Sequence, residues 1–403
     1  MSTQPPDPQR PAAGARPLRI GIVAGEASGD QLGAGLVREL RLRFPDAEIA
    51  GIGGAGMRAE GFDAWHDYRV LAVMGLAEVL RHLPRLLRLR ATLTRRLLAW
   101  RPDVFVGIDA PDFCLGVEKR LRQAGLRTVH YVSPSIWAWR ESRAEKIGAS
   151  ADRVLCLFPM EPEIYARFGV DARFVGHPLA EQFPMDPDRN AARAALALPF
   201  GAPLLAVLPG SRTGEIRRLA PAFLDALALL QARIPSLQAV VPMANPDARD
   251  AFAAVLAAHP ARTELAPMLH TLDGRAHEAM IAADVVLLAS GTAALEAMLA
   301  KRPMVVGYRI APTTHFIVKR LGLLRIDHYS LPNVLAGEPL VPELMQDDCT
   351  GPQLADAVAG WFEAPERVAR LLPRFRALHQ SLRRDADMLA ADAIAELATG
   401  GPR

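Results

Sequence analysis

Residues 18–44 read LRIGIVAGEASGDQLGAGLVRELRLRF, and this stretch decides the fold class. The apolar run LRIGIVA (18–24) is typical of a parallel strand that is buried on both faces. The run ends at Gly25, and a helical stretch, QLGAGLVRELRLRF (31–44), follows the short loop. A strand, a loop and a helix in this order predict an α/β protein with a parallel sheet.

The same pattern recurs along the chain and predicts two parallel sheets. Further apolar runs are expected to form strands at residues 48–52, 103–108, 128–132, 154–158 and 173–175, and then at 204–208, 238–242, 284–288 and 304–307. Between the two series, PLAEQFPMDPDR (178–189) is rich in proline and acidic residues, which is typical of an interdomain linker. Two such series imply two α/β domains, each with helices on both faces of its sheet.

Chain length supports this division, because 403 residues is long for one domain. We expect a disordered, proline-rich tail at residues 1–17, an N-terminal domain at 18–185 and a C-terminal domain at 186–365. Residues 366–403 are expected to end in one amphipathic helix, at about 373–397, which could pack back on the N-terminal domain.

The composition excludes several classes of protein. Hydrophobic residues make up 50% of the chain and charged residues 23%, which favours a packed core, and a net charge of +3 is too small for a nucleic-acid polycation. The three cysteines form no C-x-x-C pair, which argues against a disulfide framework or zinc site and favours a reducing compartment. The N-terminus lacks the apolar core of a signal peptide, and no apolar run reaches the ~18 residues of a membrane span. A cytoplasmic protein is therefore expected.

Ligands of parallel α/β sheets bind beyond the carboxyl ends of the strands, so the loops after the apolar runs hold the candidate site residues. GEASGD (25–30) offers Glu26, Ser28 and Asp30, which suit sugar hydroxyls better than a phosphate. Alternatively, Ser28 or Asp30 merely caps the next helix. GIGGAG (51–56) loosely resembles a dinucleotide fingerprint, but no acid follows the next strand to bind a ribose, so a tight turn is expected instead of an NAD site.

The loop after DVFVGI (103–108) carries two carboxylates, Asp109 and Asp112. A carboxylate held rigidly at the end of a buried strand can act as a general base. We expect one of the two to cap the following helix and the other to be free. No D-x-D metal motif is present, so chemistry without a metal or other cofactor is favoured.

In the second half, LPGSRTGE (208–215) combines a strand end, a glycine turn and a helix start, which predicts a diphosphate cradle. Arg212 can donate two hydrogen bonds to phosphate oxygens. SGTAALE (290–296) repeats the arrangement, and its Glu296 could accept hydrogen bonds from a ribose diol or, alternatively, could be a first-turn acid that favours the helix dipole. The other UDP-binding candidates in the two loops are Ser211, Thr213, Gly291 and Thr292.

Together these loops resemble one family, the lipid-A-disaccharide synthases, which are GT-B type glycosyltransferases. The matching segments are GEASGDQLGA (25–34), GIGGAGMRAEGF (51–62), VMGLAEVL (73–80), DVFVGIDAPDF (103–113), HYVSPSIWAWR (130–140), FVGHPLAE (174–181), LPGSRTGEI (208–216), LLASGTAALEAMLAKRPMVVGYR (287–309) and SLPNVLAGEPLVPELMQ (330–346). IDAPDF and VSPSIWAWR are highly specific, whereas LPGSR and SGTAALE recur more broadly among glycosyltransferases. The resemblance extends over nearly the whole chain.

The resemblance implies two Rossmann-like domains whose parallel sheets face each other across a cleft that holds the active site. It also implies an inverting transfer of 2,3-diacylglucosamine from UDP to the 6-hydroxyl of 2,3-diacylglucosamine 1-phosphate, which gives the disaccharide 1-phosphate and UDP. On this basis Asp109 would be the base, with Asp112 the next candidate, and Arg212 would hold the diphosphate. Asn333 would serve the donor, and Glu26, Ser28 and Asp30 would line the acceptor side.

Residues 80–101, LRHLPRLLRLRATLTRRLLAWR, are a candidate membrane-contact helix at the cytoplasmic face of the inner membrane. An apolar stripe at helical spacing comprises Leu83, Leu86, Leu87, Leu93, Leu97 and Trp100, and the basic residues include Arg85, Arg88 and Arg95. Both substrates implied by the resemblance carry acyl chains, so contact with an anionic membrane surface is expected. The alternative is a helix that packs on the sheet, with its stripe in the core, at least near Trp100.

Two other functions stay open at this point. A related GT-B enzyme, such as another UDP-GlcNAc transferase or a UDP-GlcNAc 2-epimerase, would share the scaffold, but an epimerase would be expected to have more acidic and histidine residues in its cleft. A periplasmic two-domain binding protein would require a signal peptide, which is missing from this sequence.

Overall fold

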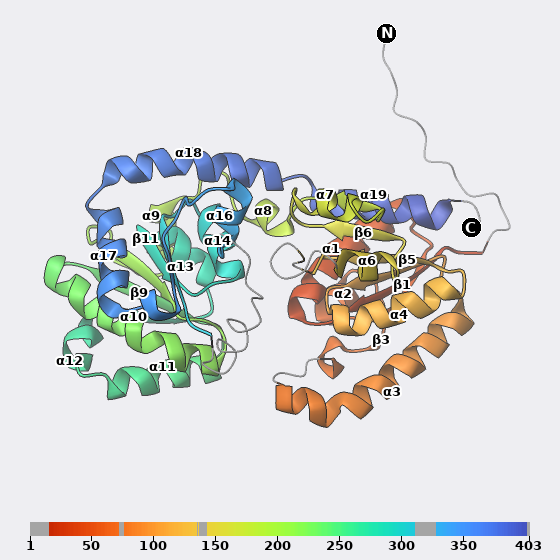
Figure 1. Ribbon diagram of the computed structural model, residues 1–403, viewed down its shortest axis with the longest axis horizontal. Helices are drawn as coiled ribbons and strands as arrows, with labels where there is room; N and C mark the ends of the chain where they lie inside the picture. The colour runs from red at the N-terminus through yellow and green to blue at the C-terminus, as the bar shows by residue number, and fades with distance from the viewer. Residues whose placement is uncertain (1–15, 72–75, 135, 137–142, 311–327, 401–403) are drawn as a thin grey trace, which may run out of the picture. The chain divides into compact units, whose positions relative to one another are not determined.

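The computed structural model describes residues 16–71, 76–134, 136, 143–310 and 328–400, and these form two compact units (Figure 1). The first unit holds the described residues up to Val175 together with those from Asp385 onward, and the second holds residues 176–384. The chain therefore enters the second unit ahead of the segment 178–189 that was expected to be the linker. That segment forms a short helix, α8 (Pro178–Gln182), and the start of α9 (Arg189–Ala195).

Within the described residues of the first unit, seven parallel strands form one sheet in the order β3-β2-β1-β4-β5-β6-β7. The strands are β1 (Arg19–Ala24), β2 (Glu48–Ile52), β3 (Asp63–His66), β4 (Val104–Ile108), β5 (Arg127–Tyr131), β6 (Arg153–Cys156) and β7 (Ala172–Phe174). The helices are α1 (Ala27–Arg43), α2 (Ala55–Ala59), α3 (Leu76–Trp100), α4 (Pro111–Gln123), α6 (Arg143–Gly148), α7 (Glu161–Ala166) and α19 (Ala386–Thr399), with a 3-10 turn at Tyr68–Val70.

Alternation along the strands gives this sheet two cores. On β4, Val104, Val106 and Ile108 pack with α1 and α19 on one face. Phe105, between them, packs with α3 and α4 on the other face. Both faces are thus covered by helices, which explains why the strands read as continuous apolar runs.

Within the described residues of the second unit, six parallel strands form a sheet in the order β10-β9-β8-β11-β12-β13. They are β8 (Leu204–Leu208), β9 (Gln238–Met243), β10 (Leu269–Asp273), β11 (Val285–Leu288), β12 (Met304–Tyr308) and β13 (Glu343–Met345). The helices, besides α8 and α9, are α10 (Thr213–Arg233), α11 (Pro246–Ala258), α12 (Arg262–Leu265), α13 (Ala276–Ala282), α14 (Thr292–Leu299), α16 (Leu331–Ala336), α17 (Gly351–Phe362) and α18 (Pro365–Leu382), with 3-10 turns at Ala266–Met268 and Gln346–Asp348.

The predicted strands are all present, to within a residue or two at their ends, and three further strands were missed. The missed strands are β3, β10 and β13, which lie at sheet edges. Their residues are only partly buried or exposed. An edge strand is not covered on all sides, so it lacks the continuous apolar run by which central parallel strands are recognised.

The C-terminal region differs from the prediction of one helix. The chain forms two helices, α18 and α19, separated at Arg383–Asp385, where Asp385 has a φ of 56°. Helix α18 ends where Arg383 adopts an extended backbone, with φ −85° and ψ 99°, and the left-handed Asp385 is the N-cap residue of α19. The break lets α18 belong to the second unit and α19 to the first, where Ile394 is fully buried in the core.

Candidate active site

Both sheets reverse their strand order once, and the loops at the two reversals contain the predicted site residues other than Asn333 and the arginines of α3. In the first unit the reversal lies between β1 and β4, and in the second between β8 and β11. At such a switch point neighbouring loops leave the sheet in opposite directions and open a crevice at the carboxyl ends of the strands. The segments 25–30 and 109–112 are therefore the candidate half-site of the first unit, and the segments 209–215 and 289–296 are that of the second unit.

The two loops of the first half-site touch. A Cβ atom added to Gly25 would lie 2.2 Å from Cβ of Ala110, so only glycine fits at this position. The contact brings Glu26 close enough to Asp109 for its carboxylate to raise the pKa of Asp109.

Asp109 is held in an unusual conformation at the end of β4. Asp109 has a φ of 53° and Ala110 a φ of 44°, so two successive non-glycine residues are left-handed. The backbone N–H of Asp109 donates to the carbonyl of Tyr131, 2.9 Å away, which ties the turn to β5. Such strain persists only where surrounding contacts enforce it, and it is concentrated at functional sites. Burial, and secondarily the charge of Glu26, raises the pKa of Asp109 above its ordinary value, which makes the carboxylate a stronger base.

The expectation that either Asp109 or Asp112 caps the next helix is wrong. The N-cap of α4 is Ala110, and no side chain makes the capping hydrogen bond. Asp112 lies exposed in the first turn of α4.

Of the three acceptor-side candidates, two are exposed and one is structural. Ser28 Oγ donates to Glu26 Oε1 over 2.7 Å, and both side chains are exposed at the switch point. Asp30 is only 8% exposed, and its carboxylate accepts backbone N–H bonds from Gly54 (2.6 Å), Gly56 (3.0 Å) and Met57 (3.2 Å). The Asp30 carboxylate thus holds the glycine-rich turn and the start of α2, and its contact with the acceptor stays a prediction.

In the second half-site, the loop after β8 is arranged around a carboxylate that sequence reasoning missed. Gly210 has a φ of 121°, and a Cβ atom there would lie 2.2 Å from Glu215 Oε2. Burial raises the pKa of Glu215, while backbone hydrogen bonds from Ser211 and Arg212 lower it. The Glu215 carboxylate therefore stabilises the loop through these hydrogen bonds. Ser211, Arg212 and Thr213 are exposed, and Arg212 is the N-cap residue of α10.

The adjacent loop after β11 turns at Gly291, whose φ is 112°, and leads into α14 at Thr292. Both residues are exposed. The first turn of α14 contains no acid, so the alternative that Glu296 is a first-turn acid is wrong. Glu296 Oε1 lies 3.5 Å from Nε2 of His277, and this contact raises the pKa of His277. His277, on α13, was not predicted, because nothing in the sequence links it to Glu296.

Asn333 is buried and fully engaged within its own unit. It is 1% exposed; its Nδ2 donates to the Val341 carbonyl (2.9 Å) and to Glu343 Oε1 (2.8 Å), and its Oδ1 accepts from Val341 N (2.9 Å). The amide therefore has no N–H left for a donor substrate. These bonds join α16 to β13, and a contact of Asn333 with the donor stays a prediction.

Helix α3 carries the predicted membrane-contact residues and is divided between core and surface. Leu93 and Leu97 are buried in the core with Phe105. Leu83 and Leu87, one turn apart, are 41% and 44% exposed. The side chains of Arg85, Arg88 and Arg95 are exposed. None of the helices in the described ranges combines the length and apolar character that crossing a bilayer requires.

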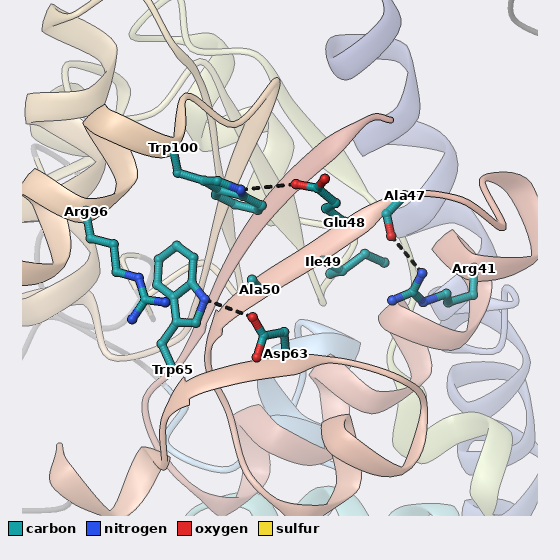
Figure 2. Close-up of a pocket in the computed structure, with 9 residues that line it drawn as sticks. All are labelled: Arg41, Ala47, Glu48, Ile49, Ala50, Asp63, Trp65, Arg96 and Trp100. Atoms are coloured by element: carbon teal, nitrogen blue, oxygen red, sulfur yellow. Dashed lines mark hydrogen bonds between the residues drawn. The ribbon is translucent and has the colours of Figure 1, made fainter. Parts of the chain in front are cut away.

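A pocket of about 430 Å³ lies where the last turns of α3 meet the sheet, and Figure 2 shows its lining. Trp65 and Trp100 pack edge to face at 5.2 Å, and the Arg96 guanidinium lies 3.9 Å from the centre of the Trp65 ring. The indole N–H of Trp65 donates to Asp63, and that of Trp100 donates to Glu48. The pocket includes the first residues of β2 and β3, so it lies at the opposite end of the sheet from Asp109. Its contacts anchor the C-terminal half of α3.

Comparison with known proteins agrees with the sequence motifs. Residues 20–394 match the family described as lipid-A-disaccharide synthetase. A protein named lipid-A-disaccharide synthase from Xanthomonas euvesicatoria pv. vesicatoria (strain 85-10) is 61% identical over 390 residues, which are 97% of this chain and 88% of that protein.

Solved structures share the fold at low sequence identity. The UDP-GlcNAc 2-epimerase from Neisseria meningitidis bound to UDP-GlcNAc has a TM-score of 0.65 at 12% identity, over 94% of this chain and 100% of its own. CalG4, the calicheamicin glycosyltransferase, has a TM-score of 0.56 at 17% identity, over 95% and 98% of the two chains. These likenesses show the GT-B fold alone, and the sequence relatives do not favour the epimerase alternative. This chain belongs to the lipid-A-disaccharide synthase family of glycosyltransferases.

Proposed function

We propose that the protein transfers 2,3-diacylglucosamine from UDP to the 6-hydroxyl of 2,3-diacylglucosamine 1-phosphate. The observation that best supports this proposal is the 61% identity, over 97% of the chain, to a relative named lipid-A-disaccharide synthase. The half-sites suit the two substrates: carboxylates and a hydroxyl in the first unit for an acceptor sugar, and an arginine beside a helix N-terminus in the second for the UDP diphosphate.

Asp109 is the proposed base. Its carboxylate accepts the proton of the acceptor 6-hydroxyl while that oxygen attacks C1 of the donor sugar, and the bond from C1 to the UDP oxygen breaks as the anomeric centre inverts. The raised pKa of Asp109 supports the role, because a base with a pKa closer to the working pH takes up a proton more readily. Glu26 and Ser28 are proposed to position the acceptor sugar.

Departing UDP is proposed to be held by the second unit. Arg212 donates to the diphosphate oxygens as negative charge develops there, helped by backbone N–H groups at the start of α10. Ser211 and Thr213 add hydroxyls, and Gly291 and Thr292 offer the same kind of loop at the start of α14. Glu296, oriented by His277, is proposed to bind the ribose diol.

The membrane-facing part of the proposal rests on the exposed half of α3. Leu83 and Leu87 lie exposed on one side of the helix, and Arg85 and Arg88 are exposed beside them. A surface that combines apolar and basic side chains binds anionic bilayers from one side. We infer that α3 holds the enzyme at the cytoplasmic face of the inner membrane, where both acylated substrates reside.

The reaction is tested by incubating the protein with UDP-2,3-diacylglucosamine and 2,3-diacylglucosamine 1-phosphate and measuring UDP release together with disaccharide formation. UDP release should require both substrates. UDP release without disaccharide, or epimerisation of UDP-GlcNAc alone, would contradict the proposed transfer.

A further inference from the structure

Two ionisable side chains are paired deep in the first unit, close behind Asp109. Glu118 of α4 and His130 of β5 are both completely buried, and His130 Nδ1 lies 2.7 Å from Glu118 Oε1. Gly107 on β4 leaves the space for the Glu118 carboxylate, because a Cβ atom at this position would lie 2.2 Å from Glu118 Oε1. An apolar pair of similar volume is often at least as stable at such a position as a buried ion pair, so stability alone does not account for this one.

The pair retains hydrogen-bonding capacity that its surroundings leave unused. Within the described part of the chain, Glu118 Oε2 and His130 Nε2 are both buried without a hydrogen-bond partner. Buried polar atoms normally have partners, and leaving two unsatisfied lowers stability. Buried ionisable groups with this cost are typical of functional sites.

The pair lies within electrostatic reach of Asp109. His130 is the register partner of Gly107, and the Asp109 backbone N–H bonds the carbonyl of the next residue, Tyr131. The charge of His130 lowers the pKa of Asp109, in opposition to burial and Glu26, which raise it.

The other charged and titratable groups near Asp109 come from the elements packed around it. Glu26 after β1 and His130 on β5 shift the pKa of Asp109, and Cys114 and Glu118 lie on α4, against which Arg90 of α3 also packs. Of the two groups whose charge shifts the pKa of Asp109, His130 is the one that can be positive.

We propose that Glu118 and His130 are positioning residues that keep Asp109 ionised. In the proposed pair His130 carries a proton on both ring nitrogens, its Nδ1–H donates to the Glu118 carboxylate, and the positive charge of the imidazolium acts on Asp109. The pair carries no net charge, so it can be buried, yet its positive member is the one that acts on the base. This inference rests on the base role of Asp109 proposed above.

Glu118→Gln tests the proposal, because glutamine keeps the size and the acceptor oxygen but removes the charge. The acid limb of the plot of kcat/KM against pH should move to higher pH by about one unit. On that limb kcat/KM should therefore fall about tenfold. At high pH the activity of the variant should approach that of the wild type. A purely structural role would lower kcat/KM by the same factor at every pH. An unmoved acid limb would overturn the proposal.

Glu161→Gln is the matched control. Glu161 is another buried carboxyl of the same unit, 1% exposed, and it accepts from the backbone N–H of Phe158. The groups that bond its carboxylate, Phe158, Ser133 and Leu157, are not among those that shift the pKa of Asp109, whereas Glu118 bonds His130, which is. This variant should lower the melting temperature without moving the acid limb; an equal movement in both variants would count against a specific role of Glu118.

A measurement on the wild-type protein keeps the proposal testable if the Glu118 variant does not fold. His177 and His379, the other fully or nearly fully buried histidines of the described chain, each receive a donor at Nδ1. The proposal requires His130, whose Nδ1 faces a carboxylate, to be protonated at both ring nitrogens. NMR of ring-nitrogen-labelled histidine should detect one such buried ring, and its absence would overturn the pairing.

Asp109→Asn separates the two proposals. If Asp109→Asn keeps near-normal turnover, the base assignment fails, and the role of the pair fails with it. If Asp109→Asn is inactive and Glu118→Gln leaves the acid limb in place, only the role of the pair fails.

Discussion

At the scale of single residues, the same side-chain types serve both chemistry and structure, and their contacts separate the two. Asp109 and Asp30 are both carboxylates that follow the strands of one switch point. Asp30 is occupied by three backbone N–H groups, whereas Asp109 is half-buried beside another acid. Different consequences are therefore expected when each is replaced.

Asp109→Asn should lower kcat by about 10²–10⁴-fold, because general-base catalysis contributes that much and the amide cannot accept the proton. UDP affinity should stay close to that of the wild type, because Asp109 belongs to the other half-site. Steady-state kinetics and calorimetric titration with UDP measure both quantities. Near-normal turnover would shift the assignment to Asp112.

Asp30→Ala should lower the free energy of unfolding by about 2–4 kcal/mol, because the buried N–H groups of the glycine-rich turn lose a charged acceptor. Ser28→Ala, at an exposed position of the same loop, is the control and should keep the wild-type melting temperature. Chemical denaturation compares the two variants. Unchanged stability in Asp30→Ala, with a raised KM for the acceptor, would support the substrate-contact role.

Arg212→Ala should weaken UDP binding by about 10- to 150-fold, since a charge-assisted hydrogen bond contributes about 1.5–3 kcal/mol. Arg370→Ala removes an exposed arginine on α18 of the same unit and should leave the affinity unchanged. Isothermal titration calorimetry gives both values, and equal affinities in the two variants would contradict the diphosphate role.

At the scale of elements, helix α3 has one half packed in the core and the other half exposed at the surface. Its C-terminal half is anchored by Leu93, Leu97 and the edge-to-face pair of Trp65 and Trp100, while Leu83 and Leu87 are exposed. The anchor should let the exposed half be altered without loss of the fold.

Replacing Arg85, Arg88 and Arg95 together by Ser should weaken co-sedimentation with anionic liposomes at low salt, because each basic residue near anionic lipid contributes about 1 kcal/mol. Binding of the wild type should fall as salt rises, since the attraction is screened. A variant with Arg217, Arg262 and Arg370 replaced by Ser removes the same charge from exposed positions of the other unit and should bind like the wild type. If the wild-type protein does not co-sediment with anionic liposomes at low salt, α3 only packs on the sheet and does not bind the membrane.

At the scale of the whole molecule, the C-terminus is part of the first unit. Ile394 of α19 is buried in its core, and Glu396 bonds Arg173 of β7. Hydrogen bonds from Arg173 lower the pKa of Glu396 from its ordinary 4.5 to about 2. A carboxylate with a depressed pKa stabilises the fold above its unfolded pKa, so this contribution should be present above pH 4.5 and be lost as pH falls toward 2.

Truncation after Arg384 should therefore abolish a stable first unit, because the core side chains that α19 covers would be exposed at a cost of about 1.5–3 kcal/mol each. Truncation after Thr399 keeps all of α19 and should melt like the full chain. Differential scanning calorimetry of the two proteins is the measurement, and a stable first unit without α19 would contradict the assignment.

The sequence by itself determined the α/β class, the central strands and the family, because buried parallel strands and the loops that follow them leave local patterns such as LRIGIVAGEASGD and IDAPDF. It also pointed to both switch points, since each is a loop directly after an apolar run. Tertiary structure alone decided which polar side chains in those loops are free, because hydrogen bonds such as those from the glycine-rich turn to Asp30 join residues far apart in the chain. It likewise revealed Glu215, His277 and the Glu118–His130 pair, whose roles depend on burial and on partners that no local pattern encodes.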